Sequence, residues 1–291
     1  MQQPIGASEL IINPRGAVYH LDLRPDELAD TIITVGDPDR VPLVSKYFDR
    51  IEVRKQHREF VTHTGWFQGK RISVVSTGIG PDNIDIVLNE LDALVNIDFT
   101  NKTNIKDRKS LNIIRIGTSG SLQPHIPVDS FVVGKHALGL DNMMAFYDQN
   151  KAYDDPMAQA LRTSQLLPNA VVPYGVSPSK QLLKLWDPHT CILANTLTSV
   201  GFYGPQGRVL GTWSAQKKLM DGLVSFNFNG QTIDHIEMET SAIYGLSSVF
   251  GHQAVSLNAI LANRSHQTFS KHPEKTINKL IEWALEHLSQ V

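Results

Sequence analysis

The chain has 291 residues, of which 41% are hydrophobic and 19% charged, and its formal net charge is −2. This composition is ordinary for a globular protein, and the lack of a basic excess argues against nucleic acid or an anionic membrane as a partner. A single cysteine, Cys191, excludes an internal disulfide and favours a reducing compartment, which we expect to be the cytoplasm. No stretch approaches the length of a membrane span, and no signal peptide is recognisable.

Short β-rich runs alternate with helical patterns along the chain, which predicts an α/β fold with a partly parallel sheet. Several runs are almost continuously apolar, as expected of strands that are covered on both faces. The predicted strands are residues 31–35, 71–77, 112–118, 130–138, 190–197, 234–239 and 254–262. The predicted helices are residues 82–96, 240–251 and 273–290. The polar stretch at 96–110 is expected to be a surface loop or an insertion between a helix and the next strand. No linker divides the chain, so we predict one domain over residues 1–291, with 1–18 as an N-terminal extension.

Three of the predicted strands run directly into loops that are rich in glycine, serine and threonine. These loops read "TVGDPDR", "STGIGPDN" and "RIGTSGS". Ligands of open α/β sheets bind beyond the carboxyl ends of strands, and small residues let backbone N–H groups approach an anion. The alternative interpretation is that the loops are merely tight turns between strands and helices.

Two arginines accompany these loops. Arg115 interrupts the apolar strand "NIIRIGT", where a guanidinium needs a partner to offset the cost of burial. Either a structural ion pair or a bound anion just ahead of "GTSG" would provide one. Arg40 closes "GDPDR" at an expected helix start, where backbone N–H groups also favour an anion.

Glu237 and Glu239 form a pair of carboxylates in the motif "HIEMET". On a strand both would project from one face, with Met238 on the other. Vicinal sugar hydroxyls are suitable donors for such a pair. A metal is the alternative, but no histidine or aspartate accompanies the pair at ligand spacing, so we predict no metal site. "GIGPDN" lacks the third glycine of a dinucleotide fingerprint, and no phosphate-binding P-loop or nucleophile elbow is present.

Taken together, the motifs resemble those of a known family. "TVGDPDRV", "HREF", "STGIGPDN", "RIGTSGSLQPHIPVDSFVV", "FYGPQGR", "EMETSAIYGL" and the "NR" at 263–264 occur in the order seen in nucleoside phosphorylases of the uridine phosphorylase type. The resemblance runs from about Tyr19 to the C-terminal helix. It implies a central mixed, twisted sheet flanked by helices, and phosphorolysis of a nucleoside to a free base and ribose 1-phosphate. It also implies a homohexamer built from dimers, in which each active site borrows residues from the neighbouring subunit. Phosphate would be the co-substrate, with no metal or organic cofactor.

The resemblance also assigns roles to individual residues. For phosphate it implies Gly36, Arg40, Arg115 and Thr118, with Arg58 supplied by the partner subunit. For ribose it implies Glu239 on the 2′- and 3′-hydroxyls, Met238 against the sugar, Glu237 nearby, and the partner's His20 near the 5′-hydroxyl. For the base it implies Ser119, Gly120, Phe202, Gln206, Arg208 and Arg264. Asn83 stands where some members use a serine for a monovalent cation, although Glu59 matches the carboxylate of that site.

The loop "FYGPQGR" favours a pyrimidine. The Gln206 amide can donate to a uracil carbonyl and accept from the ring N–H, while Arg208 can donate to the other carbonyl. Purine-specific relatives carry an aspartate where this chain has Ala262 and Asn263. We therefore predict uridine as the nucleoside. Purine nucleosides, hydrolysis without phosphate, and a non-catalytic nucleoside-binding or storage protein are the alternatives. The three arginines argue against the last two, since neither needs a phosphate site.

Overall fold

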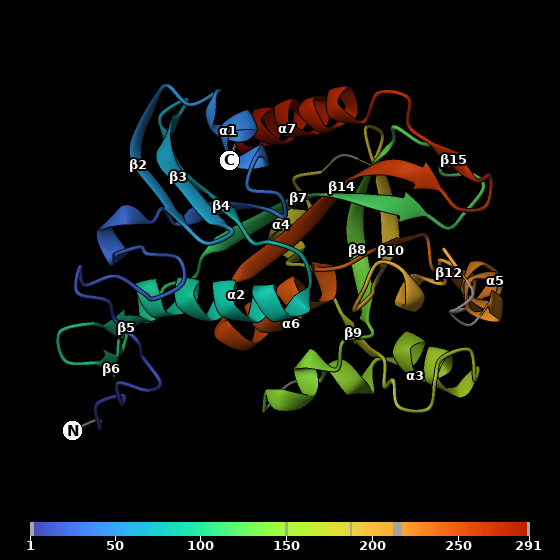
Figure 1. Cartoon of the computed structure of the whole chain (residues 1–291), viewed down its shortest axis with the longest axis horizontal. Coiled ribbons are helices and arrows are strands. Elements are labelled where there is room, and N and C mark those ends of the chain that lie inside the picture. The colour runs from blue at the N-terminus through green and yellow to red at the C-terminus, as the bar shows by residue number, and fades with distance from the viewer. Residues whose placement is uncertain (1–2, 149–150, 187, 212–216, 290–291) are drawn as a thin grey trace.

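A computed structural model describes residues 3–148, 151–186, 188–211 and 217–289. Its centre is a mixed eleven-stranded sheet in the order β15-β14-β8-β10-β13-β7-β1-β4-β3-β2, with β9 attached to β8. β14 pairs with β7 as well as with β8, so β14, β8, β10, β13 and β7 close into a ring. Helices flank this sheet (Figure 1). The predicted α/β fold with a central mixed sheet is confirmed.

The elements have the following bounds. The strands of the main sheet are β1 (Thr31–Val35), β2 (Arg50–His57), β3 (Phe60–Phe67), β4 (Lys70–Ser76), β7 (Asn112–Ser121), β8 (Phe131–Gly139), β9 (Tyr174–Val176), β10 (Ile192–Thr198), β13 (His235–Glu237), β14 (Gln253–Asn263) and β15 (Thr268–Phe269). Two small hairpins are formed by β5 (Ile97–Asp98) with β6 (Thr103–Asn104), and by β11 (Asn227–Phe228) with β12 (Gln231–Thr232). The α-helices are α1 (Arg40–Ser45), α2 (Pro81–Asn96), α3 (Pro156–Thr163), α4 (Lys180–Leu183), α5 (Lys217–Ser225), α6 (Thr240–Phe250) and α7 (Pro273–Ser289). The 3₁₀ helices are η1 (Pro25–Glu27), η2 (Met143–Phe146), η3 (Ala152–Asp154) and η4 (Gly204–Gln206).

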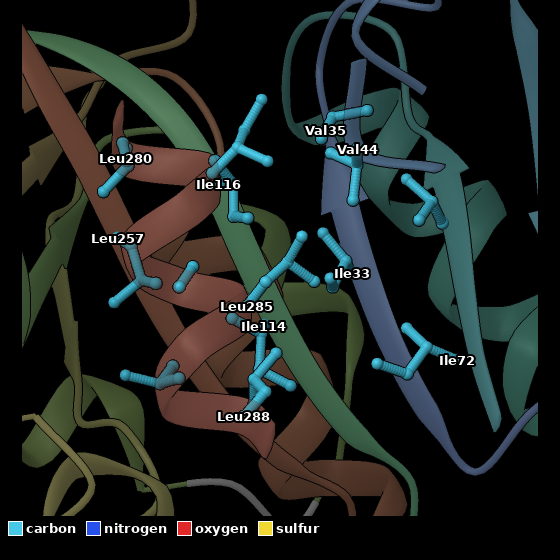
Figure 2. Packing of buried hydrophobic residues seen from close by; sticks show 14 of the residues in the cluster. Ile33, Val35, Val44, Ile72, Ile114, Ile116, Leu257, Leu280, Leu285 and Leu288 are labelled. Atoms are coloured by element: carbon cyan, nitrogen blue, oxygen red, sulfur yellow. The ribbon is translucent and has the colours of Figure 1, made fainter. Parts of the chain in front are cut away.

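Successive residues of the central strands belong to two different cores. Ile33 and Ile114 belong to a cluster with residues of α1 and α7, whereas Ile32 and Ile113 belong to a cluster with residues of α2 and α6. Figure 2 shows the first cluster, in which leucines of α7 lie against β7 and β14. Because neighbouring side chains of a strand point to opposite faces, a strand covered on both faces is apolar throughout. This explains the uninterrupted apolar runs in the sequence.

Proline and glycine set the ends of the helices that flank the site. α2 begins at Pro81, immediately after Gly80, whose φ of 97° is accessible mainly to glycine. α6 ends at Gly251, which has a φ of 80° and continues into β14. None of the helices in the described residues is both long and apolar enough to cross a bilayer.

The structure corrects two of the expected strands. β7 continues to Ser121, so "GTSGS" is strand rather than loop, because β13 and β14 pair with it up to its last residue. The strand predicted at 234–239 is limited to β13, and Glu239 instead precedes α6. The hairpin of β2 and β3 was not predicted.

Parts of the predicted N-terminal extension and of the predicted C-terminal helix lie outside the described residues. Position 290 of the predicted C-terminal helix lies outside the described residues, as do positions 1–2 of the expected N-terminal extension. Ala17 and Val18 of that segment are buried, and Val18 packs into the core beneath α2.

Candidate active site

A cavity of about 740 Å³ opens where β1, β4, β7 and β10 end and where β13 meets α6. It gathers most of the residues that the sequence singled out. Those lining it are Gly36, Arg40, Arg115, Thr118, Ser119, Gly120, Phe202, Gln206, Arg208, Glu237, Met238 and Glu239. His20, Arg58 and Arg264 do not line it. The loops at the strand ends therefore do converge, as expected of ligand-binding loops in α/β sheets.

Arg115 is the buried cation of this cavity. Its guanidinium lies 3.1 Å from Glu237 Oε2, forms an ion pair with Glu239, and donates to Asn258 Oδ1 at 2.7 Å. Burial disfavours the charged form, but Glu237 and Glu239 outweigh it and raise the pKa of Arg115. The structural ion pair considered from the sequence is thus present. The role of Arg115 in binding phosphate stays a prediction.

Arg40 supplies a second, less compensated positive charge. It is the first residue of α1, and its Nη1 donates to the Ile116 carbonyl oxygen at 3.4 Å. Burial lowers the pKa of Arg40, Asp37 opposes this effect, and the nearby charge of Arg115 adds to it. Two neighbouring guanidiniums that repel one another define the part of the cavity where an anion is stabilised.

The two glutamates meet at Arg115, which the sequence did not predict. Glu237 ends β13 and accepts from Thr198 Oγ1 at 2.7 Å and from the Thr240 amide at 3.0 Å, so its carboxylate also holds the start of α6. Glu239 lies in the turn after the strand and accepts from the Gly80 amide at 2.8 Å. Burial raises the pKa of Glu239, and Arg115 opposes that shift. The carboxylates share one guanidinium rather than one strand face.

The loop "FYGPQGR" follows β10 and lines the cavity with Phe202, Gln206 and Arg208. Gln206 closes the 3₁₀ turn η4 and is only 2% exposed. The Arg208 guanidinium stacks on Phe202 at 3.7 Å from the ring centroid, donates to the Phe202 carbonyl oxygen at 2.6 Å, and contacts Gln206 Oε1. Burial, together with the charge of Arg264, lowers the pKa of Arg208 to about 10. Arg264 itself donates to the Gln206 carbonyl oxygen at 3.3 Å and so supports the loop.

His20 and Arg58 lie together, outside the cavity. Arg58 is exposed at the turn between β2 and β3, with its guanidinium 5.9 Å from the ring centroid of Tyr19. His20 neighbours that ring, and its Nδ1 lies 2.7 Å from Glu90 Oε1. Glu59, the residue after Arg58, does line the cavity. The turn of the hairpin thus places Glu59 in the cavity of its own chain and Arg58 on the adjoining surface.

Several lining residues were not assigned by sequence reasoning. They include an apolar wall formed by Ile236, Leu261, Ala262 and Phe269. Glu59, which matches a carboxylate of the relatives' cation site, and Asn83, which replaces its serine, both lie against Gly78, where an added Cβ would approach Asn83 Nδ2. Within the described residues, no group of three or more histidine, cysteine, aspartate or glutamate side chains is arranged to hold a metal.

Comparison with known proteins places the chain in a family. Residues 30–290 match the model of the Phosphorylase superfamily. A uridine phosphorylase from Thermococcus kodakarensis is 30% identical over 278 residues, covering 94% of this chain and 88% of the relative. A DeoD-type purine nucleoside phosphorylase from Alkaliphilus metalliredigens is 29% identical, covering 92% and 97%. A crystal structure of a Trypanosoma brucei nucleoside phosphorylase, described as showing uridine phosphorylase activity, superimposes with a TM-score of 0.86 at 30% identity, covering 97% of this chain and all of that one.

The fold is that of an enzyme family, and the cavity lies at the ends of the strands. The chain belongs to the Phosphorylase superfamily, and the family resemblance inferred from the sequence motifs is confirmed.

Proposed function

We propose that the protein is a uridine phosphorylase, which converts uridine and phosphate to uracil and ribose 1-phosphate. The observation that carries the proposal is that one cavity is lined by two groups of polar side chains: Arg40 and Arg115 with Glu239, and Gln206 with Arg208. The first group suits phosphate and the ribose hydroxyls, and the second suits the base. The single cysteine supports the cytoplasm as its compartment.

The positive end of the cavity binds and orients phosphate. Arg40 and Arg115 hold the anion beside Thr118 and Gly36, so that a phosphate oxygen faces C1′ of the ribose. Glu239 accepts from the ribose hydroxyls. As phosphate attacks, the bond from C1′ to the base breaks and the base leaves with a negative charge. Positioning of this kind supplies roughly 7–11 kcal/mol of barrier reduction in favourable cases. The arginines provide the positive charge, and we propose that no metal or organic cofactor is needed.

The other end of the cavity recognises uracil. Arg208 Nη1 donates to Gln206 Oε1, so a base that replaces this contact meets a freed donor on the guanidinium and a freed acceptor on the amide. Arg208 stabilises the charge that develops on the departing uracil, an effect worth roughly 2.7–4 kcal/mol per donor in a comparable case. The ring of Phe202 provides an apolar surface beside Gln206 and Arg208.

Purine nucleosides remain the second candidate because purine nucleoside phosphorylases are among the relatives. Two features disfavour them. Ala262 lines the cavity where purine-specific members carry a carboxyl group. Asn263 is 1% exposed, and its amide donates to the Gln123 and Ile126 carbonyl oxygens and accepts from the His266 amide. Asn263 is therefore occupied by the protein itself and has no group left for a purine.

One assay panel tests the reaction and the base. Uridine, thymidine, inosine and adenosine are each incubated with and without phosphate, and release of the free base is followed. We expect uracil release that depends on phosphate. Cleavage of inosine but not uridine would contradict the base assignment, and base release without phosphate would contradict phosphorolysis. Arg208→Ala should reduce uridine turnover far more than phosphate affinity, and equal losses would argue against its role at the base.

We further propose that a second copy of the chain completes each site with its own Arg58 and His20, so that the dimer is the smallest active unit and a hexamer the assembly. Support comes from the position of both residues together on the surface, beside the hairpin that lines the cavity. Mixing inactive Arg58→Ala and Arg115→Met chains tests this. In a mixed dimer one site keeps both arginines, so co-refolding should restore about a quarter of the wild-type activity. No recovery, or a fully active monomer in sedimentation, would refute the shared site.

A further inference from the structure

Asn258 is a buried polar residue in the middle of an apolar strand, and none of the roles described so far uses it. It lies on β14, is completely buried, and does not line the cavity. Its Oδ1 accepts from Arg115 Nη1 at 2.7 Å. An uncharged amide in such a place costs free energy unless both of its ends are hydrogen-bonded. The partner of Asn258 Nδ2 therefore determines whether Oδ1 can face Arg115.

The nitrogen of the Asn258 amide is held by a second layer of hydroxyl groups. Asn258 Nδ2 donates to Ser256 Oγ at 3.1 Å, and Ser256 Oγ pairs with Thr240 Oγ1 at 2.8 Å. The backbone of Ser256 is itself fixed by the Tyr244 hydroxyl, which accepts from its amide at 2.8 Å. With Nδ2 held by Ser256, only the carbonyl oxygen of Asn258 can face Arg115.

The guanidinium of Arg115 is enclosed by these partners. Glu237 and Glu239 contact Nη2, and Asn258 contacts Nη1. Gly117 lies beneath Nη1, where a Cβ atom would collide with the guanidinium and stand 2.7 Å from Asn258 Oδ1. The side chain is thus bent back over glycine and held from two sides, which removes its rotational freedom before any ligand arrives.

We propose that Asn258 is a positioning residue that orients Arg115 for phosphate, and that it is an amide because a neutral acceptor restrains the guanidinium without adding negative charge. This inference rests on the proposed phosphate site. Two carboxylates already offset the charge of Arg115, and a third beside it would repel a phosphate anion. Asn258 therefore sets phosphate affinity without touching phosphate.

The test compares the KM for phosphate with the KM for uridine in four variants. N258A should raise the phosphate KM roughly tenfold, the effect of losing one hydrogen bond to a charged group, and leave the uridine KM within about twofold. N258D keeps the acceptor oxygen but adds charge, and should raise the phosphate KM further. S256A removes the acceptor of Asn258 Nδ2. The phosphate KM should then rise less than in N258A, again with the uridine KM within about twofold. Binding of inorganic phosphate without nucleoside, measured by calorimetry, should follow the same order.

Asn96→Ala provides the matched control. Asn96 is equally buried, donates to Asp92 Oδ1 and the Lys109 carbonyl oxygen, and ends α2, about 20 Å along the helix from Asn83 at the cavity. It should lower stability and leave the phosphate KM unchanged.

The outcomes that would contradict the positioning role differ from those that would contradict the proposed function. Unchanged phosphate KM in N258A and N258D, or equal rises for uridine and phosphate, would overturn the positioning role. If N258A does not fold, N258D and S256A decide in the same way. Failure of the proposed function is visible separately, because the wild-type enzyme itself would then release no uracil in response to phosphate.

Discussion

Arg40 and Arg115 are both proposed to bind phosphate, but their removal should have different consequences for stability. The side chains of Arg115, Glu237 and Glu239 are 6%, 1% and 6% exposed. Arg115→Met leaves two carboxylates buried without their cation. Breaking a buried ion pair from one side costs roughly 3–5 kcal/mol. The Arg40 guanidinium, by contrast, donates to one backbone carbonyl, and burial lowers its pKa. Arg40→Met therefore relieves a desolvated charge.

The size of the effect can be worked out from protonation. The variant avoids a buried charge by protonating one glutamate, whose ordinary pKa is 4.5. Each pH unit above that value costs about 1.36 kcal/mol, which sets an upper limit of about 4 kcal/mol at pH 7.5. Burial already raises the pKa of Glu239 in the native protein, so the expected loss lies below this limit. Because the glutamate binds a proton in the folded variant, the loss should shrink as the pH falls.

Urea unfolding in phosphate-free buffer, followed at pH 7.5 and 5.5, measures this difference. Both variants should lose phosphate affinity, but only Arg115→Met should lower the free energy of unfolding by several kcal/mol, and less so at pH 5.5. Arg40→Met should stay within about 1 kcal/mol of wild type. Equal stability of the two variants, or a loss in Arg115→Met that is independent of pH, would refute the assignment of the two glutamates as structural counter-ions.

Three further predictions concern residues behind the site and in the core. Burial lowers the pKa of His235 from 6.5 to about 4, so between these pH values the unfolded chain binds a proton that the native protein does not. The free energy of unfolding therefore falls by about 1.4 kcal/mol per pH unit as the pH falls through this range. His235→Gln should make the free energy of unfolding less dependent on pH there, as measured by urea unfolding. Gly117→Ala displaces the guanidinium of Arg115 and should weaken phosphate binding in calorimetry; unchanged affinity would show that the guanidinium need not lie over the glycine. Leu285→Ala leaves a cavity under α7 and should cost about 2–5 kcal/mol of unfolding free energy, with phosphate KM unaltered.

The sequence predicted the central strands well because they are apolar on both faces. It failed where burial and hydrophobicity do not coincide. β2 alternates between exposed and half-buried residues and carries charges such as Arg50, Glu52 and Arg54. The buried positions of β3 include Thr62 and Thr64, and the Thr64 hydroxyl bonds to the Ser73 hydroxyl of β4, so no apolar period marks the hairpin. The motif "HREF" linked the turn of the hairpin to the site through the family resemblance, but it did not indicate the strands on either side.

The candidate site was predictable in its composition but not in its internal contacts. The motifs named the arginines, the glutamates and the base-reading loop. The sharing of Arg115 between Glu237, Glu239 and Asn258 could not be inferred, because it depends on where three separate segments meet in space. A polar residue inside the apolar run "AVSLNAILA" was the available signal for Asn258. It indicates a buried polar contact but does not identify the partner.

The ring of five strands also has a consequence for how the protein folds. β7 and β14 are neighbours in the ring, yet Arg115 and Asn258, which join them at the site, are 143 residues apart in the sequence. Contacts between distant segments form slowly, because the entropy of closing a long loop is lost before the contact forms. Until β14 joins, β7 presents an open edge and Arg115 lacks its amide partner. Phosphate binding should therefore appear only with the last cooperative step of refolding, which makes the ligand a reporter of ring closure.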